Sequence, residues 1–192
     1  NAGRFPVYDN CQTEFFPLGQ DKYKEMIKQL ESAEKFIFME YFIVAEGKMW
    51  NSILEILKKK VAEGVEVRFM YDGTCSLMLL PYGYYKELAK YGIKSVPFSQ
   101  IRPALSTYQN NRDHRKILIV DGKVAFTGGI NLADEYINEI ERFGYWKDTA
   151  IMVKGKAVKT FTTMFLEMWN VAVKNGDITV HDIEKYVDCT DE

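Results

Sequence analysis

The chain has 192 residues, with 25 basic and 27 acidic side chains and a formal net charge of −2. This length fits one domain with a sizeable core, and the balanced charge argues against nucleic acid as a partner, because no overall positive field would attract a polyanion. The three cysteines are widely spaced and form no Cys-x-x-Cys pair or Cys/His cluster, which argues against a disulfide framework and against a zinc site.

The start of the chain predicts an arm and a helix. Residues 4–18 combine prolines and aromatics without a helical period, so we expect an edge strand or an extended arm there. Asp21 can cap the helix that follows, whose apolar side chains recur at i, i+3, i+4 and i+7 from Tyr23. This spacing is typical of a half-buried helix.

Residues 36–44 are nearly all aromatic or β-branched, as expected for a central strand that is covered on both faces. Glu40 is a carboxylate inside this apolar run, and it must find a partner or an opening to water. One interpretation is a structural salt bridge or a solvent-facing position at the strand end. The other is a supporting role at the mouth of a pocket.

The middle of the chain alternates between helix and strand patterns. Residues 49–63 predict an amphipathic helix, and residues 65–71 predict a second buried strand. A short helix with Pro81 in its first turn then leads to a strand at 93–97. Residues 99–113 form a long polar segment, and loops of this length inside a compact domain are commonly functional.

The most informative stretch is residues 112–131, with the sequence RDHRKILIVDGKVAFTGGIN. An apolar run at 117–120 meets Asp121-Gly122, and a second β-rich run at 123–127 follows, which is the strongest short-range indication of a two-stranded hairpin. Side chains two residues apart in a strand share a face. We therefore expect His114 and Lys116 to point into one pocket.

Three further groups follow the second strand of the hairpin. Gly128 and Gly129 let backbone approach a ligand closely, and Asn131 can cap a helix that we expect to begin at Leu132. Because a hairpin brings its two ends together, an imidazole, an ammonium, a glycine pair, an amide and a helix N-terminus converge. An anion such as a phosphate fits this combination.

Taken singly, these residues have simpler explanations. His114 is one of two histidines and could be a surface or core residue, Lys116 could be a solvated charge, and Asp121 could be the first residue of a type I′ turn. The combination is more specific, since His-x-Lys is followed after four residues by Asp and after six more by Gly-Gly-x-Asn.

The end of the chain predicts a last strand at 146–153 and a long amphipathic helix that starts near Lys156. The second histidine, His181, lies outside any motif and is assigned no role. Together the elements predict an α/β fold, in which helices cover both faces of one central mixed sheet. Its expected strands are 36–44, 65–71, 93–97, 115–120, 123–127 and 146–153.

The motif resembles the HKD signature of the phospholipase D superfamily. Within that superfamily, the segments MEYFIVAEG, IRPALSTYQNNRDHRK and FGYWKDTAIMVKGKAV resemble the first catalytic half of bacterial cardiolipin synthases. The resemblance spans roughly residues 5–173. It implies a phospholipase D-like α/β/α sandwich, and phosphatidylglycerol as the phospholipid substrate.

The resemblance also implies the chemistry of the site. His114 would attack phosphorus and form a phosphohistidine, which an incoming alcohol resolves, while Lys116 and Asn131 would bind the phosphoryl oxygens beside Gly128 and Gly129. Asp148 resembles the position at which relatives carry an acid that orients the histidine. Asp121 is a poor direct partner for His114, because about 20 Å of extended strand separates them, and we expect it to hold the turn.

No cofactor is expected, and no metal either, because no Asp/Glu/His cluster at ligand spacing accompanies the motif. In this superfamily the general acid comes from a second HKD half, supplied by the same chain or by a homodimer mate. One copy should therefore be inactive or weak by itself, unless it pairs with another copy.

The resemblance suggests a division of the chain. Residues 1–4 are interpreted as a cloning remnant and an arm, 5–175 as the HKD domain, and 176–192 as a tail or linker towards a second half. The family implies a bacterial cell membrane location for the longer protein, through N-terminal helices that are not present here. No apolar stretch approaches the roughly 18 residues that span a bilayer, so we expect this polypeptide itself to be soluble.

Two other enzymatic functions compete with phosphatidyl transfer. One is a phospholipase D-like phosphodiesterase, and the other is a single-HKD nuclease that works as a homodimer, against which the neutral charge argues. A phosphate-binding module without catalysis would require a degenerate motif, yet His114, Lys116, Asp121 and Asn131 are all present.

Overall fold

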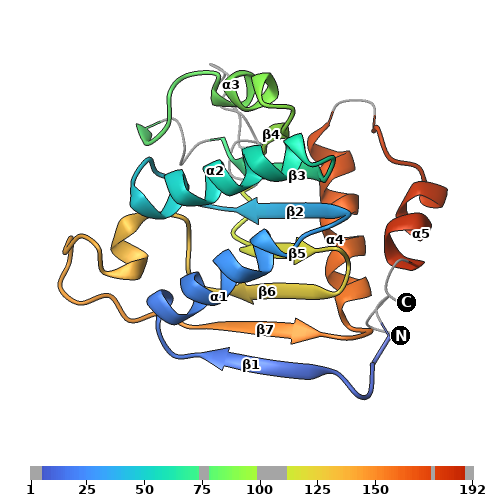
Figure 1. Cartoon of the computed structure of the whole chain (residues 1–192), viewed down its shortest axis with the longest axis horizontal. Helices are drawn as coiled ribbons and strands as arrows, with labels where there is room; N and C mark the ends of the chain where they lie inside the picture. Colours follow the sequence, from blue (N-terminus) through green and yellow to red (C-terminus); the bar gives the residue numbers. More distant parts are fainter. Residues whose placement is uncertain (1–5, 74–77, 99–111, 174–175, 189–192) are drawn as a thin grey trace.

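The computed structural model describes residues 6–73, 78–98, 112–173 and 176–188 of the chain. Within these ranges the middle layer is one mixed sheet of seven strands in the order β1-β7-β6-β5-β2-β3-β4 (Figure 1). β2, β3 and β4 are parallel to one another, and the remaining neighbours are antiparallel. The strands are β1 (Gln12–Phe16), β2 (Phe36–Tyr41), β3 (Glu66–Asp72), β4 (Lys94–Phe98), β5 (Ile117–Val120), β6 (Val124–Gly128) and β7 (Ala150–Lys154).

Helices cover both faces of the sheet, as the apolar strands require, and the predicted α/β/α sandwich is confirmed. α1, α2 and α3 pack on one face, and α4 and α5 pack on the other. Each face of β2 contributes to a different core cluster, because alternate side chains point to opposite sides. The helices are α1 (Gly19–Glu31), α2 (Lys48–Ala62), α3 (Tyr84–Lys90), α4 (Val158–Ala172) and α5 (Val180–Asp188), with a short 3-10 helix, η3 (Asp134–Ile137).

The start of α1 differs from the expectation. Leu18 is the N-cap residue, no side chain caps this end, and Asp21 lies inside the first turn, so the predicted Asp21 cap is wrong. The carboxylate still lies at the positive end of the helix dipole, where a negative charge is favourable.

The last strand also begins later than expected, at Ala150 instead of residue 146. The reason is a local clamp, in which the Asn138 side chain accepts a hydrogen bond from the Trp146 backbone N–H at 2.6 Å and donates to the Trp146 carbonyl at 2.9 Å. The backbone N–H and C=O groups of Trp146 are therefore hydrogen-bonded to Asn138 and do not pair with a neighbouring strand.

The segment 176–192, predicted as a tail or linker, contains α5, which packs against the sheet face that carries α4. The ring of Tyr186 makes edge contacts with Phe36 and Phe38, with ring centroids 5.1 Å apart in each case. The indole of Trp169 donates to the Asp177 carboxylate at 2.8 Å, which ties the connection before α5 to α4.

In the described part of the chain, every helix is too short or too polar to cross a bilayer. Two predicted features lie outside the described residues: the arm at 1–4, and the long polar loop except for its last two residues, 112 and 113.

Candidate active site

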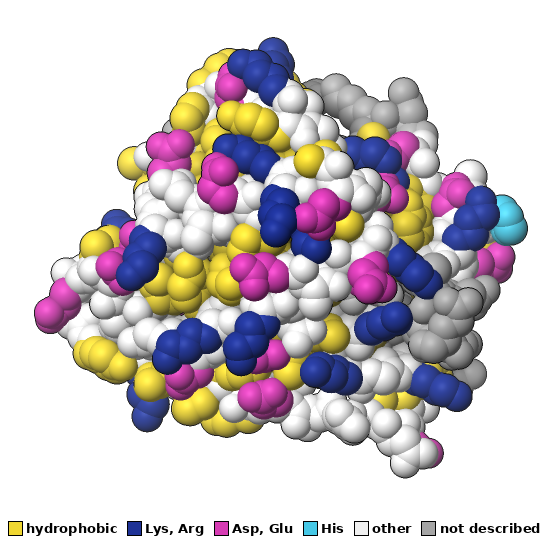
Figure 2. Space-filling view, in the orientation of Figure 1, with side chains coloured by type: hydrophobic (Ala, Val, Ile, Leu, Met, Phe, Trp, Pro, Cys, Tyr) yellow, Lys and Arg dark blue, Asp and Glu magenta, His cyan; other side chains and the backbone are white. Residues whose placement is uncertain are grey.

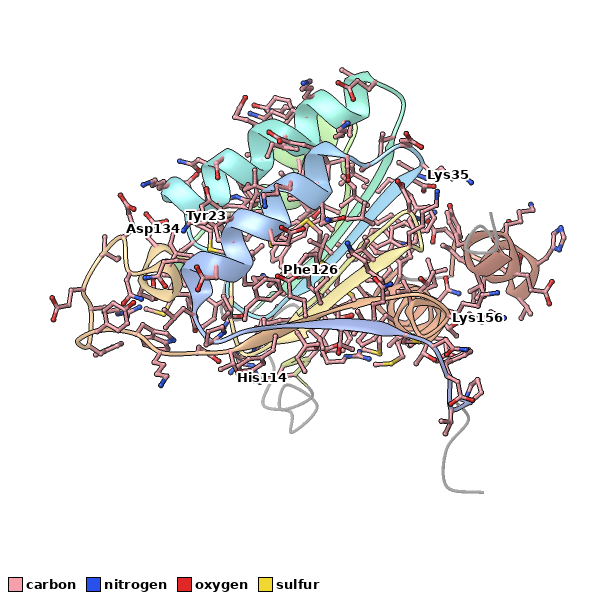
Figure 3. The ribbon with its side chains drawn as sticks, turned by 60° about the horizontal axis from the view of Figure 1, so that its bottom comes forward. Tyr23, Lys35, His114, Phe126, Asp134 and Lys156 are labelled. Carbon is pink, nitrogen blue, oxygen red and sulfur yellow. The ribbon has the colours of Figure 1, made fainter. Side chains whose placement is uncertain are left out.

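The topology brings the motif residues to one end of the sheet. β5 is antiparallel to both β2 and β6, and β6 is antiparallel to β7, so the start of β5 lies beside the ends of β2 and β6 and the start of β7. Figure 3 shows His114 at this rim of the sheet, with Phe126 in the interior. The same end holds Lys116, Gly128, Gly129, Asn131 and Asp148.

His114 and Lys116 form the centre of the site. The Lys116 ammonium lies 3.0 Å from Nε2 and 3.1 Å from Nδ1 of the imidazole, and it donates to the His114 carbonyl at 2.7 Å. One ammonium cannot lie along the in-plane lone pairs of both nitrogens, so it does not select a tautomer. The His114 side chain is exposed, whereas Lys116 is buried.

The Phe42 ring packs against the side chains of both His114 and Lys116. Its ring makes an edge contact with the imidazole, with centroids 4.5 Å apart, and the Lys116 ammonium lies 5.1 Å from the Phe42 centroid. Arg112 lies over the same ring at 5.0 Å. Two cations and an imidazole thus share one aromatic surface, and cation–π attraction to Phe42 helps to hold both cations in place.

The two glycines make room for protein atoms. A Cβ on Gly128 would lie 2.4 Å from the Thr149 carbonyl oxygen, and a Cβ on Gly129 would lie 2.1 Å from the Asp148 carboxylate. The glycine pair therefore lets β7 and Asp148 approach the end of β6, where the sequence suggested a close approach of ligand. Gly128 also lines a small pocket behind Lys116.

Asp148 lies at the correct end of the sheet, half-buried above Gly129. Its Oδ1 accepts a hydrogen bond from the Thr149 backbone N–H at 2.8 Å. In the described ranges, no hydrogen bond joins Asp148 to His114, so its orienting role stays a prediction.

Asn131 is buried and directed into the protein. Its Oδ1 accepts from the Ile43 backbone N–H at 2.9 Å, and its Nδ2 donates to the Tyr136 hydroxyl at 2.8 Å. The predicted helix cap at Asn131 is wrong, because only the short η3 follows and its N-cap residue is Ala133. Asn131 instead fixes the chain after β6 against the end of β2.

Asp121 is the one predicted site residue that the structure places elsewhere, at the opposite end of β5. Its carboxylate accepts hydrogen bonds from three consecutive backbone N–H groups, those of Glu34, Lys35 and Phe36, at 2.7–2.8 Å. Asp121 and Gly122 both have positive φ, as the predicted type I′ turn requires. Asp121 therefore holds the hairpin turn and also the start of β2.

A charged cluster that the sequence only hinted at lies behind His114. Arg115 Nε is 3.1 Å from the Glu40 carboxylate and donates to Asp113 Oδ1 at 2.9 Å. Burial raises the pKa of Glu40 to about 9, and the neighbouring Asp113 carboxylate adds to this effect. Burial opposes ionisation of Asp113 as well, but hydrogen bonds from Arg115 and Glu40 outweigh it and lower the pKa of Asp113 to about 2. The pair thus keeps one proton, on Glu40, at neutral pH.

Lys22 was not identified from the sequence. It lies four residues before Met26 on the buried stripe of α1, and this helical spacing was the available indication. Its ammonium donates to the Tyr41 hydroxyl at 3.0 Å, and both residues line the pocket behind Lys116.

No three His, Cys, Asp or Glu side chains of the described residues converge on a possible metal position. The absence of a metal requirement stays a prediction.

Comparison with known proteins identifies the family of this domain. A family model described as "Cardiolipin synthase, PLD-like domain" matches residues 26–169. A Streptococcus mutans protein is 63% identical over 174 residues, covering 91% of this chain and 38% of that protein. A protein named cardiolipin synthase from Geobacillus thermodenitrificans is 39% identical over 168 residues, covering 87% of this chain and 33% of its own length. The chain thus spans about a third of the length of these curated relatives.

Solved structures share the fold at low sequence identity. NucT from Helicobacter pylori has a TM-score of 0.64 at 15% identity, and the match covers 85% of this chain and 99% of that chain. Phosphatidylserine synthase from Haemophilus influenzae has a TM-score of 0.64 at 17% identity, and the match covers 92% of this chain and 43% of that chain.

Proposed function

Because this chain belongs to the family of cardiolipin synthase, phospholipase D-like domains, we propose that it is one catalytic half of a phosphatidyl transferase that joins two phosphatidylglycerols into cardiolipin. The observation that carries the proposal is the exposed imidazole of His114 held beside the ammonium of Lys116. A nucleophile next to a fixed cation is the arrangement that displacement at a phosphodiester requires.

The proposed reaction has two steps. A ring nitrogen of His114 forms a bond to phosphorus while the bond from phosphorus to the headgroup glycerol oxygen breaks, and glycerol leaves with a proton from a general acid. The hydroxyl of a second phosphatidylglycerol then attacks the phosphohistidine, loses its proton, and releases His114 as cardiolipin forms. Lys116 neutralises charge on the non-bridging oxygens in both steps.

The supporting residues take different roles. We assign Asp148 to orientation of the imidazole once substrate is bound, since apo hydrogen bonds in active sites often tighten only in the complex. Both the oxygen and the nitrogen of the Asn131 amide are hydrogen-bonded, to Ile43 and Tyr136. We therefore assign Asn131 a structural role at the edge of the site. The general acid would come from a second half of a longer chain or from a second copy of this chain.

The test follows the covalent intermediate. The 192-residue chain is incubated, over a range of concentrations, with phosphatidylglycerol labelled at phosphorus, and the denatured protein is counted. We expect an acid-labile, base-stable adduct that His114→Ala abolishes and that His181→Ala, a matched change of the other histidine, leaves intact. Cardiolipin formation should rise with the square of the chain concentration.

Two outcomes would contradict the proposal: an adduct that persists in His114→Ala, or activity that is linear in chain concentration. The absence of an adduct at every concentration would instead assign the general acid to a second half of a longer chain. Nicking of supercoiled plasmid, lost in His114→Ala, would favour the nuclease alternative. The formal net charge of −2 argues against it. Figure 2 shows acidic and basic side chains interspersed over the face that carries α1 and α2.

A further inference from the structure

Lys22 is a buried lysine whose hydrogen-bond partner is uncharged. Its side chain points from α1 towards the sheet, the residue is 2% exposed, and its ammonium lies 3.0 Å from the Tyr41 hydroxyl oxygen. In the part of the chain that the structure describes, no carboxylate forms an ion pair with Lys22. A buried ammonium without an opposite charge is costly, and an apolar residue would suit this helix stripe better.

The position of Lys22 connects it to the site. Lys22 and Lys116 line the same small pocket, which is too closely packed to hold a water molecule and is otherwise bounded by the ends of β2, β6 and β7. Lys116 also contacts both imidazole nitrogens of His114. Two lysines therefore border one pocket directly behind the proposed nucleophile, an arrangement that an anion would stabilise.

We propose that Lys22 is a second cationic residue of the phosphate site, a positioning residue that takes up a proton when a phosphate group binds beside Lys116. The proposal rests on the proposed function, since it assumes that the phosphate binds between His114 and Lys116. The step is a simple protonation: the neutral amine of Lys22 gains one proton from solvent, and the charge balances that of the arriving anion.

The surroundings of Lys22 permit both of its protonation states. Burial lowers the pKa of Lys22 to about 7, so the amine is largely neutral slightly above that pH. The Tyr41 hydroxyl can donate to a neutral amine, or it can accept from the ammonium while it donates to the Met26 sulfur, which lies 3.8 Å away. Tyr41 thus satisfies Lys22 before and after the proton arrives.

Few other charges face this group. The titratable residues of the pocket lining are Tyr41 and Lys116, and β6 and β7 contribute uncharged side chains to it. η3 packs on α1, but the Asp134 carboxylate binds the first backbone N–H groups of α2, and Glu135 pairs with Arg142. Within this pocket, Lys22 is therefore the group, other than Lys116 itself, whose protonation an anion at Lys116 should change most.

The experiment measures proton uptake on anion binding. Sulfate keeps a fixed charge between pH 6 and 9, so it is titrated into the chain by calorimetry at pH 8 in two buffers with different ionisation enthalpies. We expect wild type to take up close to one proton more than Lys22→Met does. Its affinity for sulfate should fall by up to about tenfold per pH unit above pH 7, as one-proton linkage requires, and Lys22→Met should lack most of this dependence.

Controls separate this inference from the proposed function. Lys24→Met removes an exposed lysine from the same helix and should behave as wild type, and Lys22→Gln, which still bonds Tyr41 but cannot be protonated there, should behave as Lys22→Met. Lys116→Met should abolish sulfate binding at every pH. If Lys116→Met abolishes binding but Lys22→Met and Lys22→Gln keep the proton uptake, the role of Lys22 is refuted and the proposed function stands. If wild type does not bind sulfate, or Lys116→Met binds it normally, both fail.

Discussion

Replacing Asp121 should destabilise the fold far more than the loss of a turn residue would. Its carboxylate binds the backbone N–H groups of Glu34, Lys35 and Phe36 at 2.8, 2.7 and 2.8 Å. Glu34 and Lys35 directly precede β2, and Phe36 is the first residue of this interior strand, which lies between β5 and β3. The side chain therefore joins the hairpin turn to the start of an interior strand across more than 80 residues of chain.

The expected loss of stability depends on whether each backbone N–H group finds another hydrogen-bond partner after the substitution. In Asp121→Ala the buried Phe36 N–H is left without a partner, which costs about 1–3 kcal/mol, while the half-buried N–H groups of Glu34 and Lys35 regain water and lose about 0.5–1 kcal/mol each. Alanine at positive φ adds about 1 kcal/mol. We expect a loss of about 4 kcal/mol for Asp121→Ala, and about 1–2 kcal/mol for Asp121→Asn, which keeps one acceptor oxygen and tolerates positive φ.

Urea unfolding followed by circular dichroism measures this difference. Lys123→Ala, an exposed change in the same turn, is the matched control and should shift the free energy of unfolding by less than about 0.5 kcal/mol. A loss of 1 kcal/mol or less in Asp121→Ala would refute the reasoning. So would a folded, stable Asp121→Ala protein that has lost the His114 adduct, because that result would assign Asp121 to the chemistry.

Three more changes test the site. Gly129→Ala should displace the Asp148 carboxylate, which a Cβ would meet at 2.1 Å; adduct formation should fall as far as in Asp148→Ala, while the free energy of unfolding falls by only about 1 kcal/mol, since a side-chain end can move. The pKa of Glu40 is raised to about 9, so the folded state keeps a proton that the unfolded state loses above about pH 4.5. As pH rises from 5 to 9, the free energy of unfolding of wild type should therefore fall, relative to that of Glu40→Gln, by up to about 1.4 kcal/mol per pH unit. If urea unfolding shows the same pH dependence for both proteins, Glu40 is not protonated in the folded state. Burial lowers the pKa of Lys22 to about 7, so below that pH the folded state holds a buried charge. Lys22→Met should therefore be more stable than wild type by on the order of 3 kcal/mol at pH 6. This gain in stability should shrink as pH rises from 7 towards 10.5, because the lysine then becomes neutral in the folded state. Thermal melts in which the gain grows with pH would contradict that assignment.

Local pattern was sufficient for the architecture. The uninterrupted apolar run of β2 indicated a strand buried on both faces, and in the structure all six of its residues are buried. The Asp121-Gly122 pair located the hairpin, because both residues tolerate the positive φ that a type I′ turn requires. This tolerance depends on the two residues themselves and not on distant contacts. The separation of two residues between His114 and Lys116 placed both side chains on one face for the same local reason.

Contacts between distant segments could not be predicted in the same way. The partners of Asp121 lie 85–87 residues away. Asn131 binds Ile43, which follows β2, and Glu40 binds Arg115, which precedes β5. Such pairs depend on strand order and register, which one sequence does not specify. The backbone clamp at Trp146 and the packing of α5 were missed because each depends on a tertiary partner that overrides local preference.

The alternation of side chains at the start of β5 explains how one short segment serves two purposes. Leu118 and Lys116 face the cluster beneath α1, whereas Ile117 and Arg115 face the cluster beneath α4. The even-numbered positions thus present His114 and Lys116 to the site, and the odd-numbered positions anchor the same backbone through Asp113 and Arg115 to the protonated Glu40. Both sets share three peptide units, so the contacts of Asp113 and Arg115 with Glu40 brace the segment that carries the nucleophile. The exposed imidazole can therefore be held in place although its own side chain makes few contacts, since the residues on either side of it are fixed from the opposite face of the sheet.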